Sequence, residues 1–251
     1  MTIYAVGDIH GHRALLDDVI ARIDRDGGTK AEVVFIGDYI DRGPDSRGVI
    51  ETLIRGQQEG RRWTCLLGNH DRMFGNFLDS GTISHPSIKS GLGWTHDRLG
   101  GLETLASYGL DAGAGRDILA LWSEAAEAVP QAHRDFLGSC PLFAERDGLL
   151  FVHAGIRPGV ALADQLEEDL IWIRDDFLMH RAAHDWMVVH GHTAVQGADH
   201  RGNRVNLDGG AGYGRPLRVA AFEAGEVFEL TPQGREKLTP GSWGAAPDWA
   251  A

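Results

Sequence analysis

The stretch that decides the fold is VVFIGDYIDRG, residues 33–43. Its first four residues are an apolar run with the length and β-branched content of a strand buried on both faces. A glycine then allows the chain to turn, and Asp38, Asp41 and Arg42 follow the strand's carboxyl end. Open α/β sheets bind their ligands at that end. The stretch therefore predicts an α/β protein with a polar site at a strand end.

Two other stretches repeat this pattern, one on each side. Residues 3–6 (IYAV) and 63–67 (WTCLL) are apolar runs, each followed by a glycine and then by a metal-type ligand, Asp8 or Asn69. Together with Asp38, these ligands recur at intervals of about thirty residues, which is the length of one strand-helix-strand unit. Parallel strands built in this way place their carboxyl ends at one edge of a sheet. We therefore expect the three ligands to lie side by side.

The pattern changes between residues 75 and 147. A loop at 80–101 and helical patterns near 102–108, 116–128 and 131–138 predict a helical insertion over 75–147 that caps or flanks the site. Substrate choice is expected to depend on this insertion, because loops carried by a rigid scaffold commonly determine what binds.

The remaining chain is predicted to return to strands and then to end in a tail. Strand patterns occur near 149–152, 186–189, 204–207, 217–222 and 227–230. Short turns between the last three suggest an antiparallel meander. We expect a single domain over 1–230. Residues 231–251 are rich in Pro, Gly and Ala and predict a mobile tail, with docking of Trp243 and Trp249 on the body as the alternative.

Charge and composition exclude some classes of partner. The 251 residues carry 36 acidic and 24 basic side chains, a formal net charge of −12. An acidic chain gains little from the attraction to phosphate that supports nucleic-acid binding, so no nucleic-acid partner is expected. No apolar run approaches membrane-span length, so no membrane partner is expected. The first predicted strand begins at residue 3, which leaves no room for a signal peptide and favours a cytoplasmic protein.

Six potential metal ligands sit at predicted strand ends. They are Asp8, His10, Asp38, Asn69, His153 and His192. Oxygen and imidazole donors without thiolates suit Mn²⁺, Fe or Zn better than a structural cysteine zinc site. Six ligands are too many for one open catalytic metal and suit two divalent metal ions that share a carboxylate. Asp38, on the middle strand, is the natural bridge.

Such a metal pair predicts phosphoryl chemistry. Two metals about 3.5–4 Å apart can lower the pKa of a bound water from about 15.7 toward 7 and hold both ends of an in-line displacement. Arg42, beside Asp38, can contact the phosphoryl oxygens through both arms of its guanidinium. His70 follows Asn69 directly and is our candidate general acid, with Asp41 orienting it.

Each motif alone has a plainer interpretation. A lone aspartate after a strand is usually a helix cap, and Asp-Gly and His-Gly turns are common. The prediction rests on five strand-end motifs in one chain. Surface or core roles are expected for His12, His85, His96, His133, His180, His184 and His200. His190 stays open between orienting substrate and supporting the ligands.

Taken together, the motifs resemble a known family. In this order, GDIHG (7–11), GDYIDRG (37–43), GNHD (68–71), HAGI (153–156) and HGHT (190–193) resemble the metallophosphatases of the phosphoprotein phosphatase family. They are most similar to its short bacterial and phage members, a serine/threonine protein phosphatase branch. The resemblance implies a calcineurin-like fold, in which two mixed β-sheets form a sandwich flanked by helices.

The resemblance also implies roles for individual residues. Asp8 and His10 would hold the first metal, with Asp38 bridging, and Asn69, His153 and His192 would hold the second. Arg42, Asn69 and Arg174 would bind the phosphate, and His70 with Asp41 would be the proton-donating pair. The position of Arg174, within IWIRDD, is assigned by the resemblance alone. The diadenosine tetraphosphatase branch usually has glutamine in place of His10, which favours a protein substrate.

The expected function is hydrolysis of phosphomonoesters by direct attack of a metal-bound hydroxide. The expected substrates are phosphoserine or phosphothreonine in proteins, together with small phosphoesters, and Mn²⁺ is the favoured metal. The alternative is a dinucleoside polyphosphate hydrolase, such as a diadenosine tetraphosphatase. A third interpretation, an inactive binding module, conflicts with the intact set of ligands. A deep pocket with aromatic walls over 80–145 would favour nucleotides, and an open groove would favour peptides.

Overall fold

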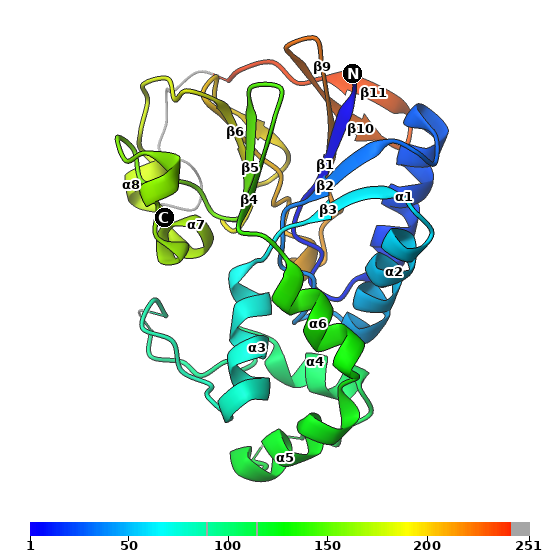
Figure 1. The fold of residues 1–251 in the computed structure, drawn as a ribbon, viewed down its shortest axis with the longest axis vertical. Helices are drawn as coiled ribbons and strands as arrows, with labels where there is room; N and C mark the ends of the chain where they lie inside the picture. Colours follow the sequence, from blue (N-terminus) through cyan, green and yellow to red (C-terminus); the bar gives the residue numbers. More distant parts are fainter. Residues whose placement is uncertain (89, 114, 242–251) are drawn as a thin grey trace.

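The chain folds into two β-sheets packed face to face, with helices on the outer side of each (Figure 1). The structure is a computed structural model that describes residues 1–88, 90–113 and 115–241. Each sheet is mixed, with both parallel and antiparallel pairs. The fold class predicted from the resemblance is therefore confirmed.

The first sheet has six strands in the order β11-β10-β9-β1-β2-β3. Its strands are β1 (Ile3–Val6), β2 (Glu32–Phe35), β3 (Arg62–Cys65), β9 (Val219–Glu223), β10 (Glu226–Thr231) and β11 (Gly234–Lys237). As predicted, β1, β2 and β3 are parallel, with β2 in the middle. The prediction of a tail from residue 231 is corrected, because β11 pairs with β10 and extends the sheet. Trp243 and Trp249 lie outside the described residues.

The second sheet has five strands in the order β4-β5-β6-β8-β7. Its strands are β4 (Phe143–Arg146), β5 (Leu149–Val152), β6 (Met187–His190), β7 (Asp199–His200) and β8 (Arg204–Asn206). Two expectations are wrong here. β4 lies inside the stretch predicted to be a helical insertion, and β8 pairs in parallel with β6 instead of joining a meander with β9.

The two sheets are held together by apolar side chains that face each other. Ala5 and Val34 of the first sheet share one buried cluster with Phe151 and Val189 of the second. Phe151 meets Phe222 edge to face, with ring centroids 6.0 Å apart. Both faces of the central strands are therefore buried, which explains their continuous apolar sequences.

Helices cover the outer faces of both sheets. The first sheet carries α1 (Arg13–Gly27) and α2 (Ser46–Gln58), and the second carries α7 (Glu167–Trp172) and α8 (Asp175–Leu178). Helix α2 begins where Asp45 accepts a hydrogen bond from the backbone N–H of Gly48 at 2.8 Å. None of the described helices is long and apolar enough to cross a membrane.

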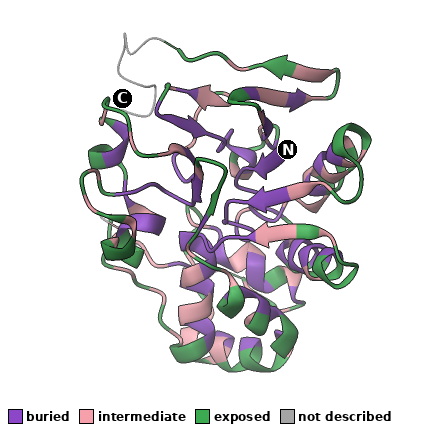
Figure 2. Cartoon of the chain, turned by 45° about the horizontal axis from the view of Figure 1, so that its top comes forward, coloured by how far each residue is buried: buried purple, intermediate pink, exposed green. Residues whose placement is uncertain are grey.

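The remaining helices form a separate group next to the strand ends, at the bottom of Figure 1. They are α3 (Asn69–Ser80), α4 (Gly101–Ser107), α5 (Ile118–Ala128) and α6 (Gln131–Ser139). Short 3₁₀ turns occur at Leu162–Asp164 and Ala211–Tyr213. Trp94, from the loop between α3 and α4, is fully buried against Phe74 and Phe77. Purple, buried segments run through the middle of this group in Figure 2, with exposed residues on its outer surface.

Candidate active site

The site lies where loops that follow strands of both sheets meet. A cleft of about 600 Å³ opens there, and its floor includes His10, Asp38 and His192. These three residues have positive φ angles of 47°, 53° and 66°. Left-handed backbone costs a non-glycine residue about 1–2 kcal/mol. Such strain is tolerated at functional sites, where the surrounding structure fixes it.

Asp71 connects the loops that follow β2 and β3 through hydrogen bonds. Its carboxylate accepts hydrogen bonds from the backbone N–H groups of Asp38 (2.8 Å), Tyr39 (3.0 Å) and Gly68 (3.0 Å). Asp38 in turn accepts a bond from the backbone N–H of His70 at 3.0 Å. The ends of β2 and β3 are thus joined through backbone groups, which fixes the position of Asp38.

Backbone carbonyl groups set the tautomers of two histidines. Nδ1 of His10 lies 2.9 Å from the carbonyl oxygen of Ile40, and Nδ1 of His153 lies 2.9 Å from that of Ile36. A carbonyl oxygen can only accept, so both Nδ1 atoms carry the proton and both Nε2 atoms present a lone pair. These Nε2 atoms lie 3.7 Å and 3.4 Å from the carboxylate of Asp38. This is the arrangement in which imidazole binds a metal.

Several buried lone pairs near Asp38 lack a hydrogen-bond donor. The Nε2 lone pair of His153 faces Oδ1 of Asn69 at 2.9 Å. Nδ1 of His192 can donate to the same oxygen at 2.7 Å, which leaves Nε2 of His192 buried without a partner. Oδ1 of Asp8 is buried without a hydrogen-bond partner, while Oδ2 accepts from the backbone N–H of His192 at 3.0 Å. Buried lone pairs that face one another are costly unless a cation lies between them. The donor set therefore fits divalent metal ions.

Burial also raises the pKa of two carboxyl groups near Asp38. Loss of solvation is the main cause for both Asp8 and Asp208. The negative charges of Asp208 and Asp38 raise the pKa of Asp8 further, and that of Asp38 raises the pKa of Asp208. Bound cations reverse such shifts, because they favour the carboxylate form.

Asp38 belongs to both clusters of metal-type ligands among the described residues, one with His10 and His70 and the other with His153 and His192.

His70 and Asp41 form a buried pair beside these clusters. Nδ1 of His70 lies 2.6 Å from Oδ2 of Asp41, and its Nε2 lies 3.1 Å from the guanidinium of Arg42. Burial raises the pKa of Asp41 to about 7, against hydrogen bonds from Thr104 and Trp94 that lower it. Burial likewise lowers the pKa of His70. Desolvation thus opposes the charged form of each partner, and contact between the two offsets that cost.

Two arginines reach the cleft from different elements. Arg42 also donates to Nε2 of His10 at 2.8 Å, and its guanidinium lies 4.8 Å from the ring centroid of Tyr213. Arg174, the residue before α8, donates to Oγ1 of Thr193 at 2.9 Å and lines the same cleft. The structure therefore brings Arg174 to the site, although only the resemblance had placed it there.

A family model described as calcineurin-like phosphoesterase matches residues 1–217 of the chain. The chain belongs to this family. The Asp and His clusters described above are suited to divalent metals.

Relatives of this phosphoesterase carry more specific names. A symmetrical bis(5'-nucleosyl)-tetraphosphatase from Janthinobacterium sp. (strain Marseille) is 35% identical over 158 residues, which cover 63% of this chain and 45% of the relative. An asymmetrical bis(5'-nucleosyl)-tetraphosphatase, PrpE of Anoxybacillus flavithermus, is 27% identical and covers 83% and 84%. The chain thus matches about half the length of the first relative and most of the second.

Solved structures support the fold. A candidate diadenosine tetraphosphatase superposes with a TM-score of 0.64 at 22% identity, covering 91% of this chain and 92% of the other. A mutant of a cold-active protein tyrosine phosphatase superposes with a TM-score of 0.65 at 16% identity, covering 95% and 80%. At these identities the solved structures show the fold alone. The family rests on the match of the family model, and the protein phosphatase branch suggested by the motifs is not shown.

Some residues of the site escaped sequence analysis. Asp208 follows the predicted strand 204–207 and precedes two glycines, so the same strand-end pattern could have identified it. Trp94 and Thr104 contact Asp41 from more than fifty residues away, and no local pattern marks them. His190, left open above, packs its ring edge to face on Phe177, with ring centroids 5.0 Å apart, and its Nδ1 lies 3.1 Å from the carbonyl oxygen of Gly191.

Proposed function

We propose that this phosphoesterase hydrolyses dinucleoside polyphosphates such as diadenosine tetraphosphate. One observation carries the proposal: arginine and aromatic side chains line the same cleft as residues of the Asp and His clusters. They include Arg42 and Arg174 and the aromatic residues Trp172 and Tyr213. Guanidinium groups bind phosphate chains, and aromatic faces stack on nucleobases.

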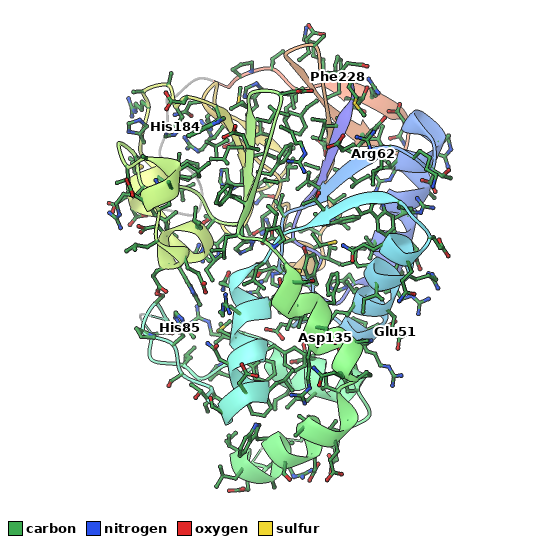
Figure 3. The ribbon with its side chains drawn as sticks, viewed as in Figure 1. Glu51, Arg62, His85, Asp135, His184 and Phe228 are labelled. Carbon is green, nitrogen blue, oxygen red and sulfur yellow. The ribbon has the colours of Figure 1, made fainter. Side chains whose placement is uncertain are left out.

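The size and walls of the cleft are consistent with a nucleotide. Its volume of about 600 Å³ lies within the range of small-molecule sites, about 300–1,000 Å³. The insertion supplies Pro86, Ile88 and Leu99 to the wall. Aromatic walls over 80–145 were the feature that would favour nucleotides. Among the described residues, the tryptophan and tyrosine that line the cleft are Trp172 and Tyr213, which lie outside that range. Trp172 stacks on His85 with ring centroids 4.7 Å apart, and His85 lies on the loop below α7 in Figure 3.

The acidic rim of the cleft does not exclude a polyanion. Asp169 and Asp176 lie on this rim, but Arg157 donates to both carboxylates, at 2.6 Å and 3.0 Å. The single positive charge of Arg157 offsets one of these two negative charges, so the rim keeps a net negative charge. A bound polyphosphate would therefore depend on Arg42 and Arg174, which line the same cleft.

Each side chain has a distinct task in the proposed reaction. Divalent metal ions, when bound by the Asp, Asn and His ligands, supply the activated water and positive charge for the phosphoryl group. Arg42 and Arg174 orient the phosphoryl oxygens and stabilise charge that develops on them. In this structure Nε2 of His70 accepts from Arg42 and carries no proton. In the proposed reaction the doubly protonated ring gives its Nε2 proton to the leaving oxygen and returns to the neutral form, and Asp41 holds the ring through Nδ1.

Hydrolysis of phosphoserine or phosphothreonine in proteins is the second candidate, since the motif order favours it. A phosphomonoester would use the same arginines and the same proton donor. The named relatives and the aromatic walls favour the nucleotide. The histidine at position 10, where the tetraphosphatase branch usually has glutamine, is therefore a weaker guide to the substrate than the cleft.

A direct comparison of substrates tests the proposal. We expect the Mn²⁺-loaded protein to turn over diadenosine tetraphosphate with kcat/KM at least about tenfold above that for a phosphothreonine peptide, which is about 1.4 kcal/mol of discrimination. Phosphate-bond cleavage is followed by chromatography of the products. Two ADP would indicate symmetrical cleavage, and ATP with AMP asymmetrical cleavage. A tenfold preference for the peptide would favour the second candidate.

Arg174→Lys tests whether this arginine binds phosphate. Lysine keeps the charge but loses the planar fork, so we expect KM for diadenosine tetraphosphate to rise about tenfold or more, as hydrogen bonds between charged groups contribute about 1.5–3 kcal/mol. Steady-state kinetics measures the change. Arg61→Lys is the matched control, because Arg61 pairs with Asp24 far from the cleft. Equal KM values for parent and Arg174→Lys would remove Arg174 from the binding site.

A further inference from the structure

We infer that the helical insertion positions the proton donor, through Thr104 and Trp94. The inference rests on the proposed hydrolytic function and adds two positioning residues to it. Both side chains are fully buried, and both donate hydrogen bonds to the carboxylate of Asp41. Thr104 lies in α4 and Trp94 in the loop before it, so the contact joins the insertion to the catalytic loop.

Both carboxylate oxygens of Asp41 have hydrogen-bond partners. Oδ1 accepts the hydroxyl of Thr104 at 2.6 Å. Oδ2 accepts the indole N–H of Trp94 at 2.8 Å and meets Nδ1 of His70 at 2.6 Å. Two rigid donors from the insertion therefore fix the carboxylate plane, and this plane fixes the ring of His70. Removing either donor leaves the carboxylate free to rotate away from Nδ1.

The insertion also supports the strained backbone of the same loop. Asp41 and Arg42 have φ angles of 71° and 66°, which are unfavourable for residues with side chains. The N–H of Asp41 donates to Oγ1 of Thr104 at 2.9 Å and to Oγ of Ser46 at 3.1 Å. The N–H of Arg42 donates to the carbonyl of Gly100 at 3.2 Å. Both backbone donors of this strained pair thus have partners in the insertion.

The hydroxyl of Thr104 uses its proton and both lone pairs in hydrogen bonds. Its proton goes to the carboxylate, and its lone pairs accept the N–H of Asp41 and the hydroxyl of Ser46, which lies 3.0 Å away. Valine has the same shape without the hydroxyl, so Thr104→Val removes these bonds with little change in packing. Serine keeps them. The pair Thr104→Val and Thr104→Ser therefore separates positioning from packing.

The kinetic test uses the leaving-group dependence of hydrolysis. A general acid matters most when the leaving oxygen is basic, as in phenyl phosphate, and least when it is acidic, as in 2,4-dinitrophenyl phosphate. For Thr104→Val in the Mn²⁺-loaded enzyme, we expect kcat for phenyl phosphate to fall about tenfold or more, and kcat for the dinitrophenyl ester to change by less than about threefold. Thr104→Ser should restore kcat for phenyl phosphate.

Matched controls remove comparable groups elsewhere. Thr52 in α2 is also a buried threonine, and its Oγ1 has no hydrogen-bond partner, so Thr52→Val should leave both rates unchanged. Trp94→Phe should reproduce the selective loss for phenyl phosphate. Its control is Trp122→Phe, because the indole of Trp122 donates to the carbonyl of Leu78, away from the site.

A spectroscopic measurement tests the positioning without turnover. The proton on Nδ1 of His70 should give a downfield ¹H NMR signal in the zinc-loaded protein, assigned by its loss in His70→Asn. We expect Thr104→Val to shift or broaden this signal, and Thr104→Ser and Thr52→Val to keep it. A protein that hydrolyses no phosphoester would refute the proposed function, and the NMR signal would still decide the positioning. An unchanged signal and unchanged leaving-group dependence in Thr104→Val would overturn the inference.

Discussion

Asp38→Asn is expected to remove metal binding and activity together. Asp38 is the residue that belongs to both ligand clusters, and the substitution replaces a carboxylate by an amide of the same shape. Supporting residues around a metal site alone cost about 10–100-fold in affinity when mutated. Loss of a shared carboxylate should therefore lower metal affinity by more than about 100-fold, or about 2.8 kcal/mol. Titration calorimetry with Mn²⁺ measures this loss, and kcat should fall at least as much.

The fold should survive this substitution. Asparagine tolerates the left-handed backbone of Asp38, whose φ is 53°, and its Oδ1 can still accept the N–H of His70. The substitution also removes one negative charge from a buried cluster that includes Asp8 and Asp208. The melting temperature of the metal-free variant should therefore be no lower than that of the parent. The parent should gain about 2.7 kcal/mol of stability from Mn²⁺ at 100 times its Kd, and the variant almost none.

The control for Asp38→Asn is a variant that loses a carboxylate away from the cleft. Asp24→Asn removes a carboxylate that pairs with Arg61 at the periphery, and it should keep both metal affinity and turnover. If Asp38→Asn bound Mn²⁺ with the parent's affinity, the assignment of Asp38 as the shared ligand would be wrong.

The first sheet could be predicted because its strands carry their own signals. Each of β1, β2 and β3 is an apolar run that ends in glycine and a polar ligand, and the spacing implies a helix between consecutive strands. Parallel pairing then follows from the crossover connections. The pattern named the ligands for the same reason, since the residues that follow parallel strands meet at one sheet edge.

The second sheet was less legible from the residues. β7 has only two residues, and β4, with the sequence FAER, is mostly exposed, so neither carries the continuous apolar run that marks β1 and β2. The connection from β8 to β9 crosses between sheets, although short loops usually join neighbouring strands. Only packing decides this crossover, because Val205 of β8 and Phe222 of β9 bury their side chains in the same inter-sheet core.

Long-range contacts limited the prediction of the site in the same way. The six strand-end residues proposed as ligands and the pair His70 and Asp41 were identified from local motifs, and the structure brings them together. Thr104 and Trp94 reach the site by folding of the insertion onto the loop at Asp41, which no spacing encodes. Asp208 differs from these two, because it does follow the strand-end pattern.

His70→Asn is expected to lower turnover without loss of metal. His70 approaches the ligands, but its Nδ1 is taken by Asp41, and its Nε2 faces Arg42 and the cleft. A positioned general acid contributes about 10²–10⁴-fold, so kcat for phenyl phosphate should fall within that range. Diadenosine tetraphosphate should lose less, because a phosphate leaving group, with a pKa near about 6, needs little protonation. Fixed-time assays measure kcat for both substrates, and elemental analysis measures the metal content.

The contrast between the two substrates distinguishes proton donation from structural damage. A misfolded site would lose both activities and its metal, whereas loss of the acid alone affects the substrate with the basic leaving oxygen. His133→Asn is the matched control, since His133 is a buried histidine that meets the hydroxyl of Tyr108 at 2.8 Å, away from the cleft. Nearly full turnover of phenyl phosphate by His70→Asn would show that another group supplies the proton, and the role assigned to Asp41, Thr104 and Trp94 would fail with it.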